Sequence, residues 1–176
     1  KITVVGSSGN FQAPYDGEKT FGSKQLLFNG SEFERKGGDL VLTAFKQIRK
    51  AIPEAKLVII GKNLAIDEEG VITPGYISSF SEMQNLFLET DLVVAPGRCD
   101  PFPTFIIEAM SYGIPCMVSA RDGMPEIVDD KVNGIVIEQP TPEIMAAQIT
   151  NLLGDVSRLE SMSLMARHKI KTQLNW

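Results

Sequence analysis

Two hydrophobic patterns alternate along the chain. Short runs of apolar, mainly β-branched residues predict strands, and longer stretches with apolar residues at helical spacing predict helices. Strands are predicted at residues 2–5, 25–28, 57–60, 71–72, 92–95, 116–118 and 135–137. Helices are predicted at residues 39–50, 82–88, 104–112, 143–153 and 155–174. Fully apolar strands that alternate with helices are typical of a parallel sheet with helices on both faces.

The alternation therefore predicts an α/β fold: a single Rossmann-like, three-layer domain with a mostly parallel sheet, spanning residues 1–176. Ser81 and Thr141 are expected to cap the helices that follow them. Residues 123–128 predict a turn into a short helix, with Pro125 in its first turn.

Sheets of this type bind ligands in the crevice at the carboxyl ends of their strands. Binding chemistry is therefore expected in the loops that follow Phe28, Ile60, Ala95 and Val118.

Composition narrows the function classes. The chain has 176 residues, enough to bury one sizeable core, and its 43% hydrophobic and 22% charged content is that of a soluble globular protein. A net charge of −5 argues against nucleic acid or an anionic membrane as the main partner. The chain starts at Lys1, without an initiator Met or a signal-like segment, so we expect a processed chain or a piece of a longer protein.

The two cysteines, Cys99 and Cys116, lie in or beside apolar runs. We expect two reduced, buried thiols in a cytosolic protein; a redox pair is the alternative. The single histidine, His168, is expected on the charged face of the last helix, with Arg167 and Lys169 beside it. No cluster of His, Cys and carboxylates has metal-ligand spacing, so no metal site is predicted.

The loop after Phe28 carries two adjacent cations, Arg35 and Lys36, before Gly37 and Gly38. A guanidinium, an ammonium and an open backbone could together hold a diphosphate. The alternative is a solvated charged loop in which the glycines only turn the chain.

The loop after Ala95 carries an acid, Asp100, and runs into a helix with a second acid, Glu108. Backbone amides at a helix start attract anions, and Pro103 suits the first helical turn. The hydroxyl of Thr104 could reach a phosphate or cap the helix. Glu108 could accept hydrogen bonds from ligand hydroxyls, or pair with a neighbouring cation. By themselves, Asp100 and Glu108 could also form a general acid/base couple.

Several short motifs follow one another along the chain. They are Gly30-Ser31-x-Phe33-x-Arg35-Lys36-Gly37-Gly38-Asp39, Leu57 to Gly61, Gly75-Tyr76, Thr90 to Pro96, Asp100-Pro101-Phe102-Pro103 with Glu108 to Pro115, Gly123 to Val128, and Asn133-Gly134. In this order the chain resembles the nucleotide-sugar-binding, C-terminal half of the family 4 retaining glycosyltransferases, the glycosyltransferase group 1 type. The resemblance covers nearly the whole chain.

The resemblance implies one half of a GT-B enzyme, in which two Rossmann-like lobes face each other across a cleft. It implies that Arg35 and Lys36 contact the donor diphosphate, that Lys36 and Asp100 act in catalysis, and that Glu108 holds the ribose. The implied donor-binding residues are Arg35, Lys36, Gly75, Tyr76, Asp100, Phe102, Pro103, Thr104 and Glu108. It implies neither metal nor cofactor, because the cations stabilise the leaving group.

Two positions depart from the family pattern. Asp100 stands where a Glu is usual, and Pro103 stands where a Gly often follows the Phe. Both changes could alter donor choice or rate.

The implied partners are a UDP- or GDP-sugar donor and a saccharide or lipid-linked acceptor held by an N-terminal lobe. That lobe is absent from this chain, so glycosyl transfer by these residues alone is not expected. A cytoplasmic location is expected, with peripheral membrane association of the intact enzyme as an open option. The alternatives are another GT-B enzyme, such as a sugar-nucleotide epimerase or a glycogen-synthase-like protein, and a non-catalytic Rossmann-like binding domain.

Overall fold

The computed structural model of the chain describes residues 14–101 and 103–174. Its strands are β1 (Gln25–Asn29), β2 (Lys56–Ile60), β3 (Val71–Gly75), β4 (Leu92–Ala95), β5 (Cys116–Ser119) and β6 (Gly134–Ile137). They form one six-stranded sheet in the order β3-β2-β1-β4-β5-β6, and every pair is parallel. The strand predicted at residues 2–5 lies outside the described residues.

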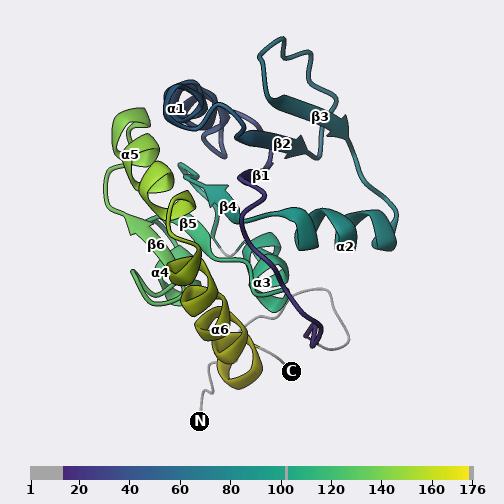
Figure 1. Cartoon of the computed structure of the whole chain (residues 1–176), viewed down its shortest axis with the longest axis vertical. Helices are drawn as coiled ribbons and strands as arrows, with labels where there is room; N and C mark the ends of the chain where they lie inside the picture. The colour runs from purple at the N-terminus through teal and green to yellow at the C-terminus, as the bar shows by residue number, and fades with distance from the viewer. Residues whose placement is uncertain (1–13, 102, 175–176) are drawn as a thin grey trace.

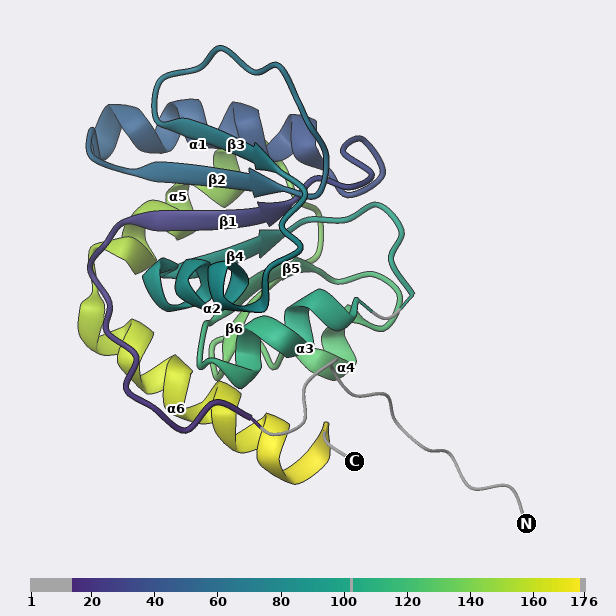
Figure 2. The same ribbon diagram turned by 90° about the vertical axis from the view of Figure 1, so that its right-hand side faces the viewer.

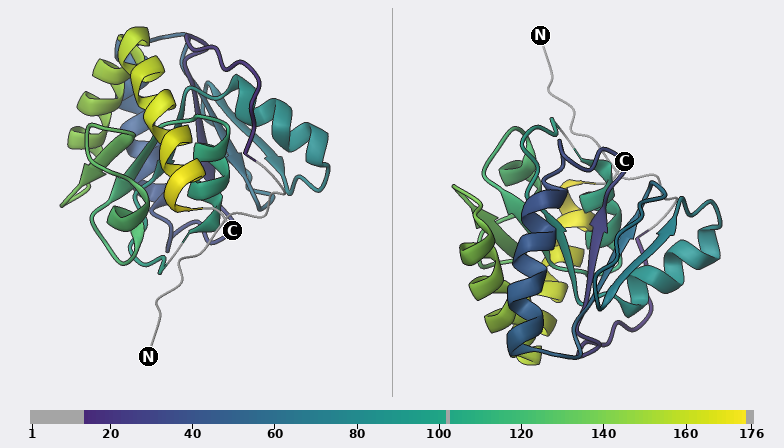
Figure 3. Two further views of the ribbon diagram at one scale, coloured as in Figure 1. Left: turned by 90° about the horizontal axis from the view of Figure 1, so that it is seen from below. Right: turned by 90° about the horizontal axis from the view of Figure 1, so that it is seen from above.

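Helices cover both faces of this sheet (Figures 1 and 3). They are α1 (Gly38–Ala51), α2 (Phe80–Glu89), α3 (Thr104–Ser111), α4 (Met124–Ile127), α5 (Pro142–Leu153) and α6 (Val156–Gln173). Side chains of α1 and α5 pack into one apolar cluster, and side chains of α2, α3 and α4 pack into the other. The long helix α6 contributes to both clusters, its first half to one and its second half to the other.

The strand sequences explain why there are two apolar clusters, one on each face of the sheet. Successive side chains of a strand point to opposite faces, so Leu26 and Phe28 of β1 join one cluster and Leu27 joins the other. All three are buried, because apolar residues occupy both faces of this central strand. The predicted three-layer α/β fold is therefore confirmed, with a fully parallel sheet.

One helix start differs from the prediction. The cap of α2 is Ser79, and its Oγ accepts a hydrogen bond from the backbone N–H of Glu82 at 3.3 Å. Ser81 lies inside the first turn, and its hydroxyl instead meets that of Ser79 at 2.9 Å. Ser79 has the extended backbone that a capping residue needs, which decides between the two serines. At α5 the predicted cap is confirmed, since Thr141 Oγ1 accepts from the N–H of Ile144 at 3.3 Å.

Two predictions of burial are wrong. Cys99 is exposed, whereas Cys116 is buried as expected. The reason is that β4 ends at Ala95, so Cys99 belongs to the loop beyond the apolar run. On α6, His168 is exposed as expected, but Lys169 is only 6% exposed. Its Nζ lies 2.7 Å from an Asp129 carboxylate oxygen, an ion pair that compensates for the burial of its charge.

Candidate functional site

The strand order places a crevice between β1 and β4. These two strands are neighbours, with Leu26 beside Leu92 and Leu27 beside Val93. The chain leaves β1 toward β2 on one side and leaves β4 toward β5 on the other, so the loops after them diverge. Figure 2 shows β1 to β4 pointing to the edge at which these loops and the start of α3 lie, and the remaining strands pair parallel to them. Such a switch point is where this class of sheet binds ligands.

The loop of residues 30–37 is folded back on itself. The N–H of Lys36 donates to the carbonyl of Glu32 at 2.9 Å, and the N–H of Gly38 donates to that of Phe33 at 2.7 Å. The ring of Phe33 packs edge-on against Phe28 with 6.0 Å between centroids, which anchors the loop to the core. These contacts fix the backbone on either side of Lys36.

Gly37 brings this loop against the loop after β4. Its φ of +79° is unfavourable for a side chain, and a Cβ added there would lie 2.7 Å from the carbonyl oxygen of Pro96. Only glycine permits this close approach, so the glycines after Lys36 do more than turn the chain.

Lys36 and Asp100 meet at the floor of the crevice. The Nζ of Lys36 lies 3.3 Å from Oδ2 of Asp100, and the two side chains are 17% and 16% exposed. Together with Asn29, Gly97 and Pro103 they line a cavity of about 20 Å³, room for about one water molecule. A ligand as large as a nucleotide must therefore lie above the pair, between the loops.

Arg35 points away from this cavity. Its Nε and Nη2 donate to the two carboxylate oxygens of Glu32 at 2.7 and 2.6 Å, and its Nη1 donates to the carbonyl of Cys99. The hydrogen bonds from Arg35 hold the pKa of Glu32 below its usual value. Arg35 lines a separate hollow of about 410 Å³ with Glu34, Asp39 and Arg98. The two adjacent cations thus face different spaces.

Arg98 is a charged residue of this region that the sequence reasoning missed. Its Nη1 and Nη2 donate to the two carboxylate oxygens of Asp39 at 2.8 and 2.6 Å, and its Nη1 also donates to the carbonyl of Glu34. The hydrogen bonds from Arg98 lower the pKa of Asp39. A signal was present, because a cation lies two positions before Asp100 and an unexplained acid opens α1.

The loop after β5 contacts the backbone of Asp100. The N–H of Asp100 donates to Oδ2 of Asp122 at 2.8 Å, and the N–H of Gly123 donates to the carbonyl of Pro101 at 3.1 Å. The Ser119 hydroxyl donates to the carbonyl of Gly97 at 2.7 Å. The predicted short helix is confirmed as α4, which follows directly.

The remaining predicted site residues surround the crevice. Pro103 is the N-cap of α3 rather than part of its first turn, and it makes no side-chain capping bond. Thr104 is exposed at the helix start, and Glu108 is half-buried about one turn further along. Gly75 ends β3 with φ +81°. Tyr76 follows it and is 79% exposed. Phe102 lies outside the described residues.

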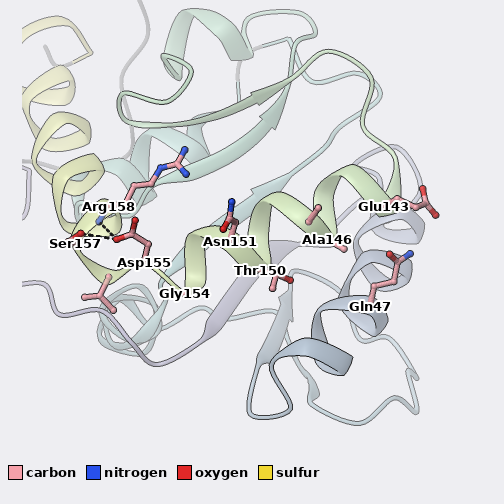
Figure 4. Close-up of a pocket in the computed structure, with 11 residues that line it drawn as sticks. Gln47, Glu143, Ala146, Thr150, Asn151, Gly154, Asp155, Ser157 and Arg158 are labelled. Carbon is pink, nitrogen blue, oxygen red and sulfur yellow. Dashed lines mark hydrogen bonds between the residues drawn. The ribbon is translucent and has the colours of Figure 1, made fainter.

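A wider hollow lies elsewhere and has a different character. It measures about 1010 Å³ and runs along α5, between α1 and the start of α6, lined mostly by small and uncharged side chains (Figure 4). Asp155 there caps α6, accepting from the N–H of Arg158 at 3.0 Å. The end of α5 lies at the amino edge of the sheet, since Lys24, just before β1, donates to the carbonyl of Leu153. We therefore place the candidate site at the smaller crevice, at the carboxyl edge.

Residues 14–101 and 103–174 contain no group of three or more His, Cys, Asp or Glu side chains arranged to hold a metal ion. None of their helices is both long and apolar enough to cross a membrane.

Comparison with known proteins identifies the family. The family model described as glycosyl transferases group 1 matches residues 16–169, most of the chain. The chain belongs to the glycosyl transferases group 1 family. The resemblance read from the motifs is thereby confirmed.

Curated relatives match this chain at low identity. D-inositol 3-phosphate glycosyltransferase of Segniliparus rotundus is 26% identical over 155 residues, covering 80% of this chain but only 34% of that protein. The chain spans about a third to a half of the length of these curated relatives.

Solved structures share the fold. A crystal structure of S. aureus TarM in complex with UDP and other ligands has a TM-score of 0.80 at 21% identity, covering 93% of this chain and 36% of TarM. The crystal structure of the C-terminal domain of LpcC, a glycosyl transferase group 1 family protein from Francisella tularensis, has a TM-score of 0.76 at 18% identity. That match covers 95% of this chain and 97% of the other, so the two are similar in extent.

Proposed function

We propose that this chain binds the nucleotide-activated sugar donor for a glycosyltransferase, in the crevice between the loops after β1 and β4. The observation that carries the proposal is the Lys36–Asp100 pair on the floor of that crevice. It stands at the switch point of a fully parallel sheet, in a chain that belongs to the group 1 family.

Lys36 has the chemistry to hold a diphosphate. Its ammonium lies at the crevice floor, and the N-terminus of α3, at Thr104, lies at the same edge of the sheet. An ammonium and a helix N-terminus both stabilise negative charge. When the sugar–phosphate bond breaks, the diphosphate gains charge, and this cation lowers the barrier by stabilising it. The proposed transfer therefore needs no metal ion.

The other residues are proposed to contact the remaining parts of the donor. Glu108 accepts hydrogen bonds from the ribose hydroxyls, and Gly75 and Tyr76 lie beside the base. Asp100 contacts the sugar or the pyrophosphate, and the hydroxyl of Thr104 contacts a phosphate. We propose retention of configuration at the sugar from the motif resemblance, and a saccharide or lipid-linked acceptor that binds outside these residues.

The donor base is proposed to be uracil or guanine. TarM, which shares this fold, was solved in complex with UDP. At 21% identity this likeness supports the type of ligand and leaves the choice of base to experiment.

Calorimetric titration of the chain with UDP and GDP, in buffer containing EDTA, tests the proposal. We expect saturable, salt-sensitive binding of at least one of the two, with uridine or guanosine binding more weakly because it lacks the phosphates. Folded protein that binds neither nucleotide would refute the proposal. Binding that disappears on adding EDTA would refute its metal-independent part.

A further inference from the structure

The loops after β1 and β4 are joined by two arginines that cross between them. Arg98, in the loop after β4, donates to the carbonyl of Glu34 in the loop after β1. Arg35, in the loop after β1, donates to the carbonyl of Cys99 in the loop after β4. Between them, the N–H of Arg98 donates to the carbonyl of Arg35 at 2.9 Å.

These contacts flank the Lys36–Asp100 pair. Arg35 precedes Lys36 directly, and Cys99 precedes Asp100 directly. The bidentate bond from Arg98 to Asp39, at 2.8 and 2.6 Å, holds the same loop from the far side of Lys36, because Asp39 lies in the first turn of α1. The backbone on both sides of Lys36 is thus tied to the loop that carries Asp100.

We infer that Arg98 is a positioning residue for the donor site, which sets the distance between Lys36 and Asp100 through its bonds to Asp39 and Glu34. It does not contact the donor itself, and Arg35 assists it through Cys99. This inference rests on the proposed function, because it specifies how that site is held in shape.

The geometry requires arginine at this position. Three acceptors, two carboxylate oxygens and one carbonyl, lie around one guanidinium whose planar fork can reach all of them at fixed angles. A lysine would keep the charge but supply a single donor centre. Arg98 and Asp39 are 47% and 52% exposed, so their attraction adds little to global stability, and its effect should be local.

The chain offers a matched control. Lys46, on α1, pairs with Glu68 at 2.7 Å, and the two side chains are 56% and 30% exposed. This ion pair is similar in type and exposure but does not touch the crevice loops. Substituting Lys46 therefore removes an exposed ion pair from the same helix without loosening the site.

The test compares Arg98→Lys, Arg98→Met and Asp39→Ala with Lys46→Met. Amide hydrogen exchange is read at Lys36 and Asp100, whose N–H groups are bonded at 2.9 and 2.8 Å in the parent. We expect exchange about tenfold faster at both amides in the three site variants, while the rest of the chain and the control stay unchanged. Affinity for UDP or GDP should fall about five- to tenfold in the same three variants.

The double variant Arg98→Met with Asp39→Ala separates a shared bridge from two independent losses. If the two side chains act through one bond, the double variant should be no weaker in affinity than the weaker single variant. Exchange rates and affinities that match the Lys46→Met control would overturn the inference, and so would an Arg98→Lys variant that behaves like the parent. If the parent binds neither nucleotide, the proposed donor function fails, and the exchange rates alone decide whether Arg98 holds the two loops together.

Discussion

The Nζ of Lys36 lies 3.3 Å from Oδ2 of Asp100, with both side chains less than a fifth exposed. The ammonium of Lys36 at the crevice floor therefore already has an anionic partner, Asp100. A diphosphate that binds there has to share this ammonium with Asp100, so the affinity of the site reflects an exchange of anions. Opposite effects are expected from removing the cation and removing the anion.

Replacing Lys36 with Met should weaken UDP or GDP binding by about tenfold or more. The variant loses a charge-assisted hydrogen bond to the phosphates, worth about 1.5–3 kcal/mol. It also leaves Asp100 without its counter-ion, which adds repulsion toward the phosphates. Calorimetry with the nucleotide and with the bare nucleoside measures the change, since nucleoside affinity should fall little. Equal affinity in the parent and the variant would remove Lys36 from the donor site.

Replacing Asp100 with Asn should strengthen binding of the free nucleotide by about two- to fivefold, because it removes a negative charge close to the proposed diphosphate position. The side chain keeps its size, so packing changes little. Titration at two salt concentrations checks the cause, since an electrostatic gain shrinks as salt rises. Weaker binding of the free nucleotide by Asp100→Asn would contradict this and would mean that the carboxylate serves the phosphates mainly by orienting the ammonium of Lys36.

The sequence predicted the fold because its signals are local. Runs such as Leu57 to Ile60 are apolar on both faces and buried, which is typical of a parallel strand covered on both sides. The predicted site loops follow from the same topology, since parallel strands end at a common edge. The capping residue of α2 was predicted less accurately, because Ser79 and Ser81 carry the same hydroxyl and differ in backbone conformation.

The arrangement of charges inside the site could not be predicted from which residues are neighbours in the sequence. Arg35 and Lys36 are equivalent cations in the sequence, yet Lys36 meets Asp100 while Arg35 bonds Glu32. That choice depends on how closely the loops after β1 and β4 approach, which Gly37 decides by its contact with Pro96. The same approach brings Arg98 to Asp39, a pair that no local pattern indicates.

Gly37→Ala should destabilise the chain by about 1–3 kcal/mol, because it adds a Cβ at positive φ and against the Pro96 carbonyl. It should also weaken nucleotide binding, since Lys36 is the preceding residue. Gly154→Ala is the control: its φ is −78° and the atoms nearest an added Cβ are 3.5 Å away. Urea unfolding of both variants measures the contrast, and equal stabilities would contradict the assigned strain.

Cys99 should report occupancy of the crevice. It is exposed beside Asp100, whereas Cys116 is buried and its burial raises the pKa of its thiol well above the usual range. N-ethylmaleimide should therefore modify one thiol in the folded chain and both in denaturant, as mass spectrometry would show. A saturating nucleotide should slow the reaction of Cys99. An unchanged rate, with binding verified in the same sample, would place the nucleotide away from this loop.

Lys19 should make stability depend on pH on the alkaline side. Its ammonium donates to the carbonyls of Thr20 and Leu88 at 2.8 Å each. Burial, helped by repulsion from Arg167, outweighs the attraction of Asp91 and lowers the pKa of Lys19 from 10.5 to about 8. Between these two values the unfolded chain binds a proton that the folded chain does not, so this group's contribution to stability rises with pH there. Below about pH 8 both states are protonated and the contribution is constant.

Lys19→Gln isolates this effect, because glutamine can still donate to a carbonyl but does not titrate. Urea unfolding of the parent and the variant from pH 7.5 to about 10.5 gives the difference between their free energies of unfolding. Other lysines and the tyrosines titrate in both proteins and cancel in that difference. We expect the parent to gain stability relative to Lys19→Gln as the pH rises through this window. A difference that stays constant with pH would mean that the two carbonyl bonds keep Lys19 charged to its ordinary pKa, and that the segment before β1 is held by an ammonium that burial does not penalise.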